Sequence, residues 1–127
     1  MSDPEASKAG LTVFRGWSGS GYYVWSPFVI KLEFRLRLGN VPYAVAAGST
    51  SAAPKKKIPY VELQRSDEAP LVIGDSSLIV KRMVEFGRLD ELHADDDASR
   101  RAQDLAMRAL LEDKLYFFSV RWSWFPI

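Results

Sequence analysis

The chain of 127 residues has no cysteine and a single histidine, His93. Without cysteine there can be no disulfide framework, no thiolate metal site and no cysteine nucleophile. A lone histidine in an acidic segment does not make a metal site either, so we expect no bound metal. The sequence also has no run of 18 apolar residues, and we therefore expect no membrane span.

The charge balance is close to even, with 17 lysines and arginines against 16 aspartates and glutamates. This balance lacks the basic excess that phosphate contacts require, so we expect no nucleic acid partner. No P-loop, dinucleotide fingerprint or nucleophile elbow is found. The start, "MSDPEASKAG", is polar and has no apolar stretch of a secretory signal. We therefore expect residues 1–10 to be a disordered leader and the protein to be cytoplasmic.

The stretch "SPFVIKLEFRLRLGN" (26–40) carries two conflicting signals. Apolar and charged residues alternate over 30–38, and this period of two slightly favours a strand. Ser-Pro at the start and Gly-Asn at the end indicate a helix instead. As a helix it would present two apolar faces and be buried from both sides, with Glu33 and Arg37 paired one turn apart. The first face holds Phe28, Val29, Leu32 and Leu36, and the second holds Ile30, Phe34 and Leu38.

The other elements follow from turn signals and periodicity. A helix over 75–87 is predicted by an Asp-Ser cap, an apolar stripe and Gly87 as its stop. A second helix is expected from Ala98 onward, after a charged linker, because apolar residues recur at helical spacing. Four strands are expected, at 11–17, 41–48, 58–65 and 71–74.

Three motifs resemble a known family. The runs "SPFVIKLEFRLRLGNVPY", "KKKIPYVEL" and "IGDSSLIVKRM" are similar, in order and spacing, to the N-terminal thioredoxin-like domain of glutathione S-transferases. The closest likeness is to the branch of failed-axon-connections and metaxin-like proteins. The run "EDKLYFFSVRW" resembles the first helix of that family's all-helical second domain.

The resemblance implies a fold and its division into domains. It favours a helix for 26–40, placed between the sheet and a helical domain. The expected class is α/β: a thioredoxin-like βαβ-ββα sandwich over 11–87 that binds glutathione. Residues 88–97 would be a charged linker, and 98–127 the first helix of a truncated helical domain.

The resemblance also suggests Ser26 as the catalytic residue. A hydroxyl at a helix N-cap can donate to the glutathione thiolate, while the helix N-terminus lowers the pKa of the thiol. Ordinary N-capping explains this serine without any function. Tyr22 and Tyr23 are weaker candidates for the same role.

Five further residues are expected to bind glutathione. Pro59 matches the cis-proline of the family, and the backbone of Ile58 would pair with the cysteinyl part, although an edge-strand proline in trans is the ordinary interpretation. Asp75 and Ser76 open the next helix and suit the γ-glutamyl group, although simple capping explains them equally well. Lys57 would meet the glycyl carboxylate, but a lysine run is usually a solvated loop.

Two classes of function remain open. In the first, glutathione is a co-substrate whose thiol attacks a small electrophile. In the second, the chain is a metaxin-like interaction module without activity, or a truncated inactive chain. The tail "LYFFSVRWSWFPI" is either a membrane-surface anchor or, as we favour, a packing face, through which a homodimer can form.

Overall fold

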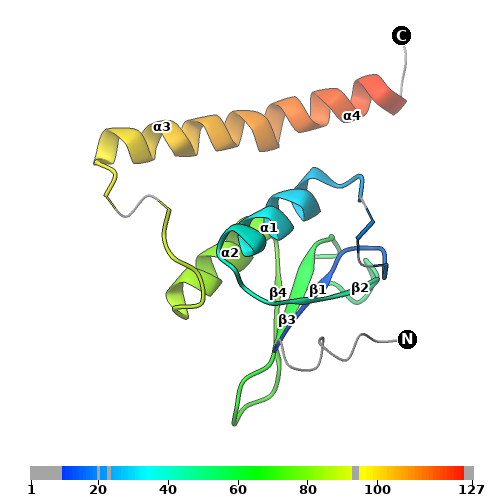
Figure 1. Cartoon of the computed structure of the whole chain (residues 1–127). Coiled ribbons are helices and arrows are strands. Elements are labelled where there is room, and N and C mark those ends of the chain that lie inside the picture. Colours follow the sequence, from blue (N-terminus) through cyan, green and yellow to red (C-terminus); the bar gives the residue numbers. More distant parts are fainter. Residues whose placement is uncertain (1–9, 20, 23, 93–94, 125–127) are drawn as a thin grey trace. The chain divides into compact units, whose positions relative to one another are not determined.

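The computed structural model describes all residues except 1–9, 20, 23, 93–94 and 125–127 (Figure 1). The expected leader lies almost entirely outside the described residues, as do Tyr23 and His93, and so does the side chain of Trp124. The chain divides into two compact units, Met1–Asp90 and Glu91–Ile127.

The first unit is a four-stranded sheet with two helices. The strand order is β2-β1-β3-β4, in which β2 runs parallel to β1 while β3 is antiparallel to both of its neighbours. This topology, βαβ followed by ββα, confirms the predicted α/β thioredoxin-like class. The elements are β1 (Leu11–Phe14), α1 (Pro27–Leu38), β2 (Ala44–Ala46), β3 (Tyr60–Leu63), β4 (Leu71–Gly74) and α2 (Ser76–Glu85).

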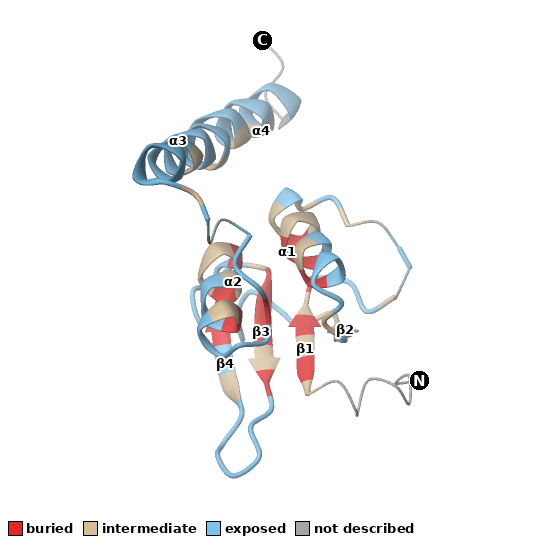
Figure 2. Ribbon diagram, turned by 60° about the vertical axis from the view of Figure 1, so that its left-hand side comes forward, coloured by how far each residue is buried: buried red, intermediate tan, exposed pale blue. Residues whose placement is uncertain are grey.

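The core lies between one face of the sheet and the two helices. Figure 2 shows buried residues on β1, β3, α1 and α2. Burying an aliphatic side chain of this size contributes about 1.5–3 kcal/mol relative to leaving it exposed, so this layer dominates the stability of the unit. The residues that form it are Leu11, Val13, Leu32, Leu36, Val61, Leu63, Ile73, Ile79, Met83 and Leu89.

The segment 26–40 is a helix, as its end signals predict, and the strand interpretation is wrong. Ser26 is the N-cap of α1, and its Oγ accepts a hydrogen bond from Val29 N at 3.5 Å. Pro27 occupies the first turn, where its missing N–H costs nothing. The alternating pattern was misleading because a charged residue of the helix, Glu33, is itself buried.

The second apolar face of α1 is less buried than the first. Leu32 and Leu36 are fully buried against the sheet, but Phe34 is 66% exposed and Leu38 is 54% exposed. Within the first unit, the sheet leaves these two residues of the second face uncovered, and the expected burial of that face against a helical domain stays a prediction. The sheet of the first unit covers only one side of this helix.

Strands β1, β2 and β3 are shorter than predicted. The first ends at Phe14, although Arg15 N and Gly16 N still donate to Ala46 O and Ala47 O at 3.0 and 2.7 Å. Gly16 then adopts a φ of +84°, which ends the extended conformation. Strand β3 begins after Pro59, which has no N–H to donate to a ladder.

No helix or strand interrupts residues 47–59, the connection between β2 and β3. Its chain crosses a stacked pair of rings, Phe14 and Tyr60, whose centroids are 4.5 Å apart. The Ser49 N–H donates to the Tyr60 hydroxyl at 3.4 Å, and Ala53 is buried. A compact loop thus covers this part of the sheet face opposite the core.

The second unit is one continuous helical run. It comprises α3 (Ala98–Ala109), a π-helical segment (Leu110–Leu115) and α4 (Tyr116–Trp124). Asp97 caps its start by accepting from Arg100 N at 2.8 Å. The sequence predicts this helix but not its π segment. In the part of the chain that the structure describes, no helix is both long and apolar enough to cross a membrane.

Candidate functional site

The topology brings both helix starts of the first unit to one end of the sheet. Strands β1, β2 and β4 are parallel, so their carboxyl ends share that end, where β3 begins. Helix α1 must run back from there to reach β2, and α2 follows β4 directly. The register pairs Tyr60 with both Phe14 and Gly74. The preceding residue, Pro59, therefore lies between the ends of β1 and β4.

Ser26 lies at the start of α1 and is partly exposed. Its Oγ acts as an acceptor for Val29 N at 3.5 Å. A hydroxyl that accepts a hydrogen bond keeps its own proton for donation. Ser26 can therefore cap the helix and still donate to an anion, so its capping role does not exclude a functional one.

The Ile58–Pro59 peptide bond is cis. Pro59 is buried and Ile58 is partly exposed. A Cβ placed on Gly16 would lie 3.4 Å from Ile58 Cδ1. The turn after β1 therefore lies next to the side chain of Ile58. No hydrogen bond joins the peptide groups of Ile58 to another described residue. The backbone there can pair with an extended ligand.

Asp75 caps α2 in an unusual backbone conformation. Its φ is +72°, in the left-handed region that side chains rarely adopt. Its Oδ1 accepts from Ser77 N at 3.0 Å and from Leu78 N at 3.2 Å. Such strained residues cost about 1–3 kcal/mol each and cluster at ligand sites. Ser76, next in the chain, is only 4% exposed, so its hydroxyl is largely covered.

The three lysines before the bend are all exposed. Lys55 is the one that the structure places beside the end of β4, because a Cβ on Gly74 would lie 3.8 Å from Lys55 Cγ. The sequence predicts Lys57 instead, because it is the lysine nearest to the proline motif. No contact among the described residues brings its ammonium to Ser26 or Asp75.

Lys31 also reaches this end of the fold, and sequence reasoning did not select it. Its Nζ donates to Ser77 Oγ at 3.0 Å, joining α1 to the first turn of α2. Its ammonium also lies 5.9 Å from the centre of the Phe28 ring. In the sequence, Lys31 lies on the flank of the predicted helix. Solvated lysines commonly occupy such positions, so the pattern does not indicate a binding role.

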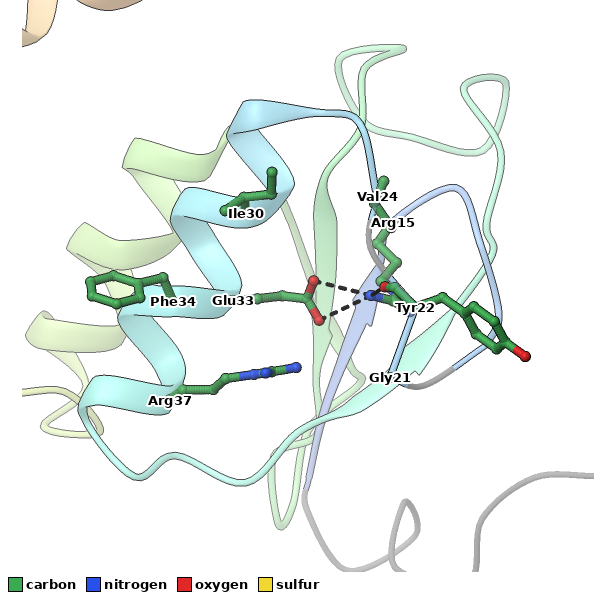
Figure 3. A pocket seen from close by; sticks show the side chains of 8 residues that line it. All are labelled: Arg15, Gly21, Tyr22, Val24, Ile30, Glu33, Phe34 and Arg37. Atoms are coloured by element: carbon green, nitrogen blue, oxygen red, sulfur yellow. Dashed lines mark hydrogen bonds and ion pairs between the residues drawn. The ribbon is translucent and has the colours of Figure 1, made fainter.

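A buried ion pair, also missed from the sequence, lies on the other side of α1. Arg15 Nη1 is 3.2 Å from Glu33 Oε2, with side chains 2% and 11% exposed (Figure 3). The Tyr43 hydroxyl donates to Glu33 Oε1 at 3.1 Å and accepts from Arg37 Nε at 2.9 Å. The predicted pairing of Glu33 with Arg37 therefore runs through Tyr43.

Two pKa values are shifted in this network. Burial raises the pKa of the Tyr43 phenol, and the hydrogen bond from Arg37 lowers it in part. The hydrogen bond to Tyr43 raises the pKa of Arg37, which remains cationic. Both shifts keep the network in its neutral-phenol, charged-guanidinium form at physiological pH.

A hollow of about 330 Å³ lies over this network, between α1 and residues 15, 21, 22 and 24 (Figure 3). Of the described residues that the sequence suggests for glutathione, Tyr22, a weaker candidate for activating the thiol, lines this hollow, whereas Ser26, Lys57, Ile58, Pro59, Asp75 and Ser76 do not. Among the described residues, no group of three or more histidines, cysteines, aspartates or glutamates is placed to hold a metal ion. The lining residues are Arg15, Gly21, Tyr22, Val24, Ile30, Glu33, Phe34 and Arg37.

Comparison with protein families shows where the chain belongs. The profile of a family described as the glutathione S-transferase N-terminal domain matches residues 27–126, which is most of the chain and includes all of α1 and α2. No curated protein and no solved structure matches the chain. The chain therefore belongs to the glutathione S-transferase N-terminal domain family.

Proposed function

We propose that the chain binds glutathione at the end of the sheet where α1 and α2 begin. The observation that carries this proposal is the topology, because it gathers the Ser26 cap, the Ile58–Pro59 bend and the Asp75 cap at that one end. We assign residues 11–87 to the glutathione-binding domain, 88–97 to the linker and 98–127 to the first helix of a second domain.

The start of α2 would hold the γ-glutamyl group. The first backbone N–H groups of a helix have no partner within the helix, and they attract anions. Asp75 Oδ1 already accepts from Ser77 N and Leu78 N. The Ser76 N–H would then bind the ligand carboxylate, and the second Asp75 oxygen, Oδ2, would bind the ligand ammonium. Lys31, bonded to Ser77, adds a positive charge beside that carboxylate.

The cysteinyl part would pair with the peptide groups of Ile58, as an added strand pairs with a sheet edge. This pairing directs the thiol toward the start of α1, where Ser26 donates a hydrogen bond to it. A hydrogen bond to the charged form and a helix N-terminus both lower the pKa of a thiol. We still assign Lys57 to the glycyl carboxylate. Lys55, two residues earlier in the chain, lies nearby.

The chemistry supported by this arrangement is attack of the glutathione thiolate on a small electrophile. The sulfur forms the new bond to carbon, and the electrophile's leaving group departs with its electron pair. Ser26 stabilises the thiolate before attack and gives up no proton to it.

The absence of cysteine is in keeping with a cytoplasmic setting.

A non-enzymatic role is favoured by a different observation. The helical run of the second unit exposes large apolar side chains on more than one side, which is typical of a helix that packs against other elements. We propose that this helix mediates assembly, either as a homodimer or as the metaxin-like module that the sequence resembles. Sedimentation decides between a monomer and a dimer. The exposed residues are Leu105, Met107, Leu110, Leu111, Leu115, Phe117, Phe118 and Trp122.

Thermal unfolding with and without glutathione tests the binding proposal. A ligand present at 100 times its Kd stabilises the folded state by about 2.7 kcal/mol, so the melting temperature must rise. Asp75→Ala should abolish this rise. Asp97→Ala is its matched control, since it also removes a helix N-cap but lies in the second unit.

Ser26→Ala separates binding from activation. It should still bind glutathione but lose the ultraviolet absorbance of the bound thiolate at neutral pH. S-methylglutathione, which has no ionisable thiol, should stabilise the wild-type chain and Ser26→Ala equally. If millimolar glutathione leaves the melting temperature of the wild-type chain unchanged, the proposal is wrong.

A further inference from the structure

We infer that Arg15 positions Ser26 by fixing the segment that joins β1 to α1; this inference rests on the function proposed above. Arg15 directly follows β1, and its side chain is only 2% exposed. An arginine is almost never buried to this degree unless its guanidinium is paired. Its partners therefore define what it does.

The guanidinium binds three backbone carbonyls of the segment that follows it. Its Nε donates to Trp17 O at 3.2 Å, its Nη1 to Tyr22 O at 3.1 Å, and its Nη2 to Gly19 O. In its described residues this segment has no helix or strand to satisfy its own carbonyls. One side chain thus provides the hydrogen bonds that a regular element would provide.

The same guanidinium also binds α1. Its Nη1 lies 3.4 and 3.2 Å from the two carboxylate oxygens of Glu33. Tyr22 precedes Ser26 by four residues and Glu33 follows it by seven, so Arg15 holds the chain on both sides of Ser26. The hydrogen bonds of this guanidinium therefore restrain both the chain segment that leads to the N-cap and helix α1 itself.

The segment is not held by an apolar core of its own. Trp17 is 59% exposed, Tyr22 is 68% exposed and Trp25 is 91% exposed, although Trp25 does make a contact. These three described side chains thus lie largely at the surface. Arg15 therefore contributes three hydrogen bonds to a described backbone that these side chains do not bury.

Only an arginine can satisfy this set of acceptors. The guanidinium has five N–H donors in a planar fork, whereas a lysine has one ammonium and no fixed geometry. Arg15→Lys should keep the charge opposite Glu33 while losing most of the carbonyl contacts. The chain provides a matched control in Arg65, an exposed arginine that pairs with Glu68 and donates to Ala69 O at 3.2 Å.

The test is backbone amide exchange followed by mass spectrometry, together with glutathione titration. In Arg15→Lys, exchange over residues 16–25 should accelerate at least about tenfold, while β3 and β4 stay protected. The absorbance of glutathione thiolate bound at Ser26 should appear only at higher pH than in the wild-type chain. Arg65→Lys should change neither measurement.

Unchanged exchange over 16–25 in Arg15→Lys would overturn the inference, as would an unchanged pH midpoint for the thiolate. If Arg15→Lys does not fold, the double variant Arg15→Met/Glu33→Leu replaces it, because it removes both buried charges and leaves neither unpaired. If the wild-type chain binds no glutathione, the proposed function fails, and the exchange data alone still show whether Arg15 fixes the segment.

Discussion

The Lys31 ammonium lies 3.0 Å from the Ser77 hydroxyl and so places a positive charge at the first turn of α2. A cation at a helix N-terminus is unfavourable unless an anion accompanies it. Asp75 provides one carboxylate at this position, and a bound ligand carboxylate would provide a second. The contact therefore makes a specific prediction about ligand binding.

Lys31→Met should weaken glutathione binding about tenfold, because it removes one charge-assisted contact to the γ-glutamyl carboxylate. The stability of the free chain should change little. Isothermal titration calorimetry at low and high salt measures the effect, which should shrink as salt increases. Lys81→Met, at an exposed position of the same α2, is the control and should leave the Kd unchanged. Equal affinity for wild-type and Lys31→Met would show that Lys31 does not face the ligand.

Tyr43→Phe should destabilise the first unit by about 1–3 kcal/mol, since Glu33 and Arg37 each lose a hydrogen-bond partner. Urea unfolding followed by circular dichroism measures this loss. Tyr22→Phe removes a hydroxyl from a residue that is 68% exposed and should change the free energy of unfolding by less than about 0.5 kcal/mol. Equal losses of unfolding free energy in the two variants would show that the Tyr43 hydroxyl does not stabilise Glu33 and Arg37.

The raised pKa of Tyr43 also predicts a pH dependence. Because burial favours the neutral phenol, the folded state holds this proton more tightly than the unfolded state does. The resulting stability is fully present below the unfolded pKa of about 10 and is lost as pH rises above it. The stability gap between the wild-type chain and Tyr43→Phe should therefore narrow between pH 9 and pH 11. A constant gap over that range would mean that the phenol is not buried.

Leu36 and Leu38 offer a matched test of which side of α1 is buried. Leu36 is fully buried, whereas Leu38 is 54% exposed. Leu36→Ala should cost about 2–5 kcal/mol by leaving a cavity in the core. Leu38→Ala should cost less than about 1 kcal/mol. Thermal and urea unfolding of both variants measure the difference, and similar losses would show that the second apolar face of α1 is covered after all.

Local signals in the sequence were sufficient for the helix starts. Ser26 before Pro27 and Asp75 before two serines fix the starts of α1 and α2 through backbone capping, which depends only on neighbouring residues. The family resemblance then predicts that both helices begin next to the bend at Pro59. Together, these two signals make the fold class predictable from the sequence.

The buried polar network was not predictable in the same way. Whether Arg15 is buried depends on carbonyls up to seven residues away and on a glutamate in another element. In the sequence, Glu33 is one of several charges in an alternating pattern, and Arg37 is its nearest opposite charge in a helix. Only the tertiary fold brings Arg15 and Tyr43 to it. Long-range pairing of this kind leaves no periodic signal.

Backbone amide chemical shifts recorded during a glutathione titration test the central claim most directly. If the tripeptide lies where the two helices begin, the largest changes should occur at Ile58, Ser76 and Ser77, with smaller ones at the first turn of α1. Changes confined to Tyr22, Glu33 and Arg37, which line the hollow on the other side of α1, would contradict the account, as would no change at all.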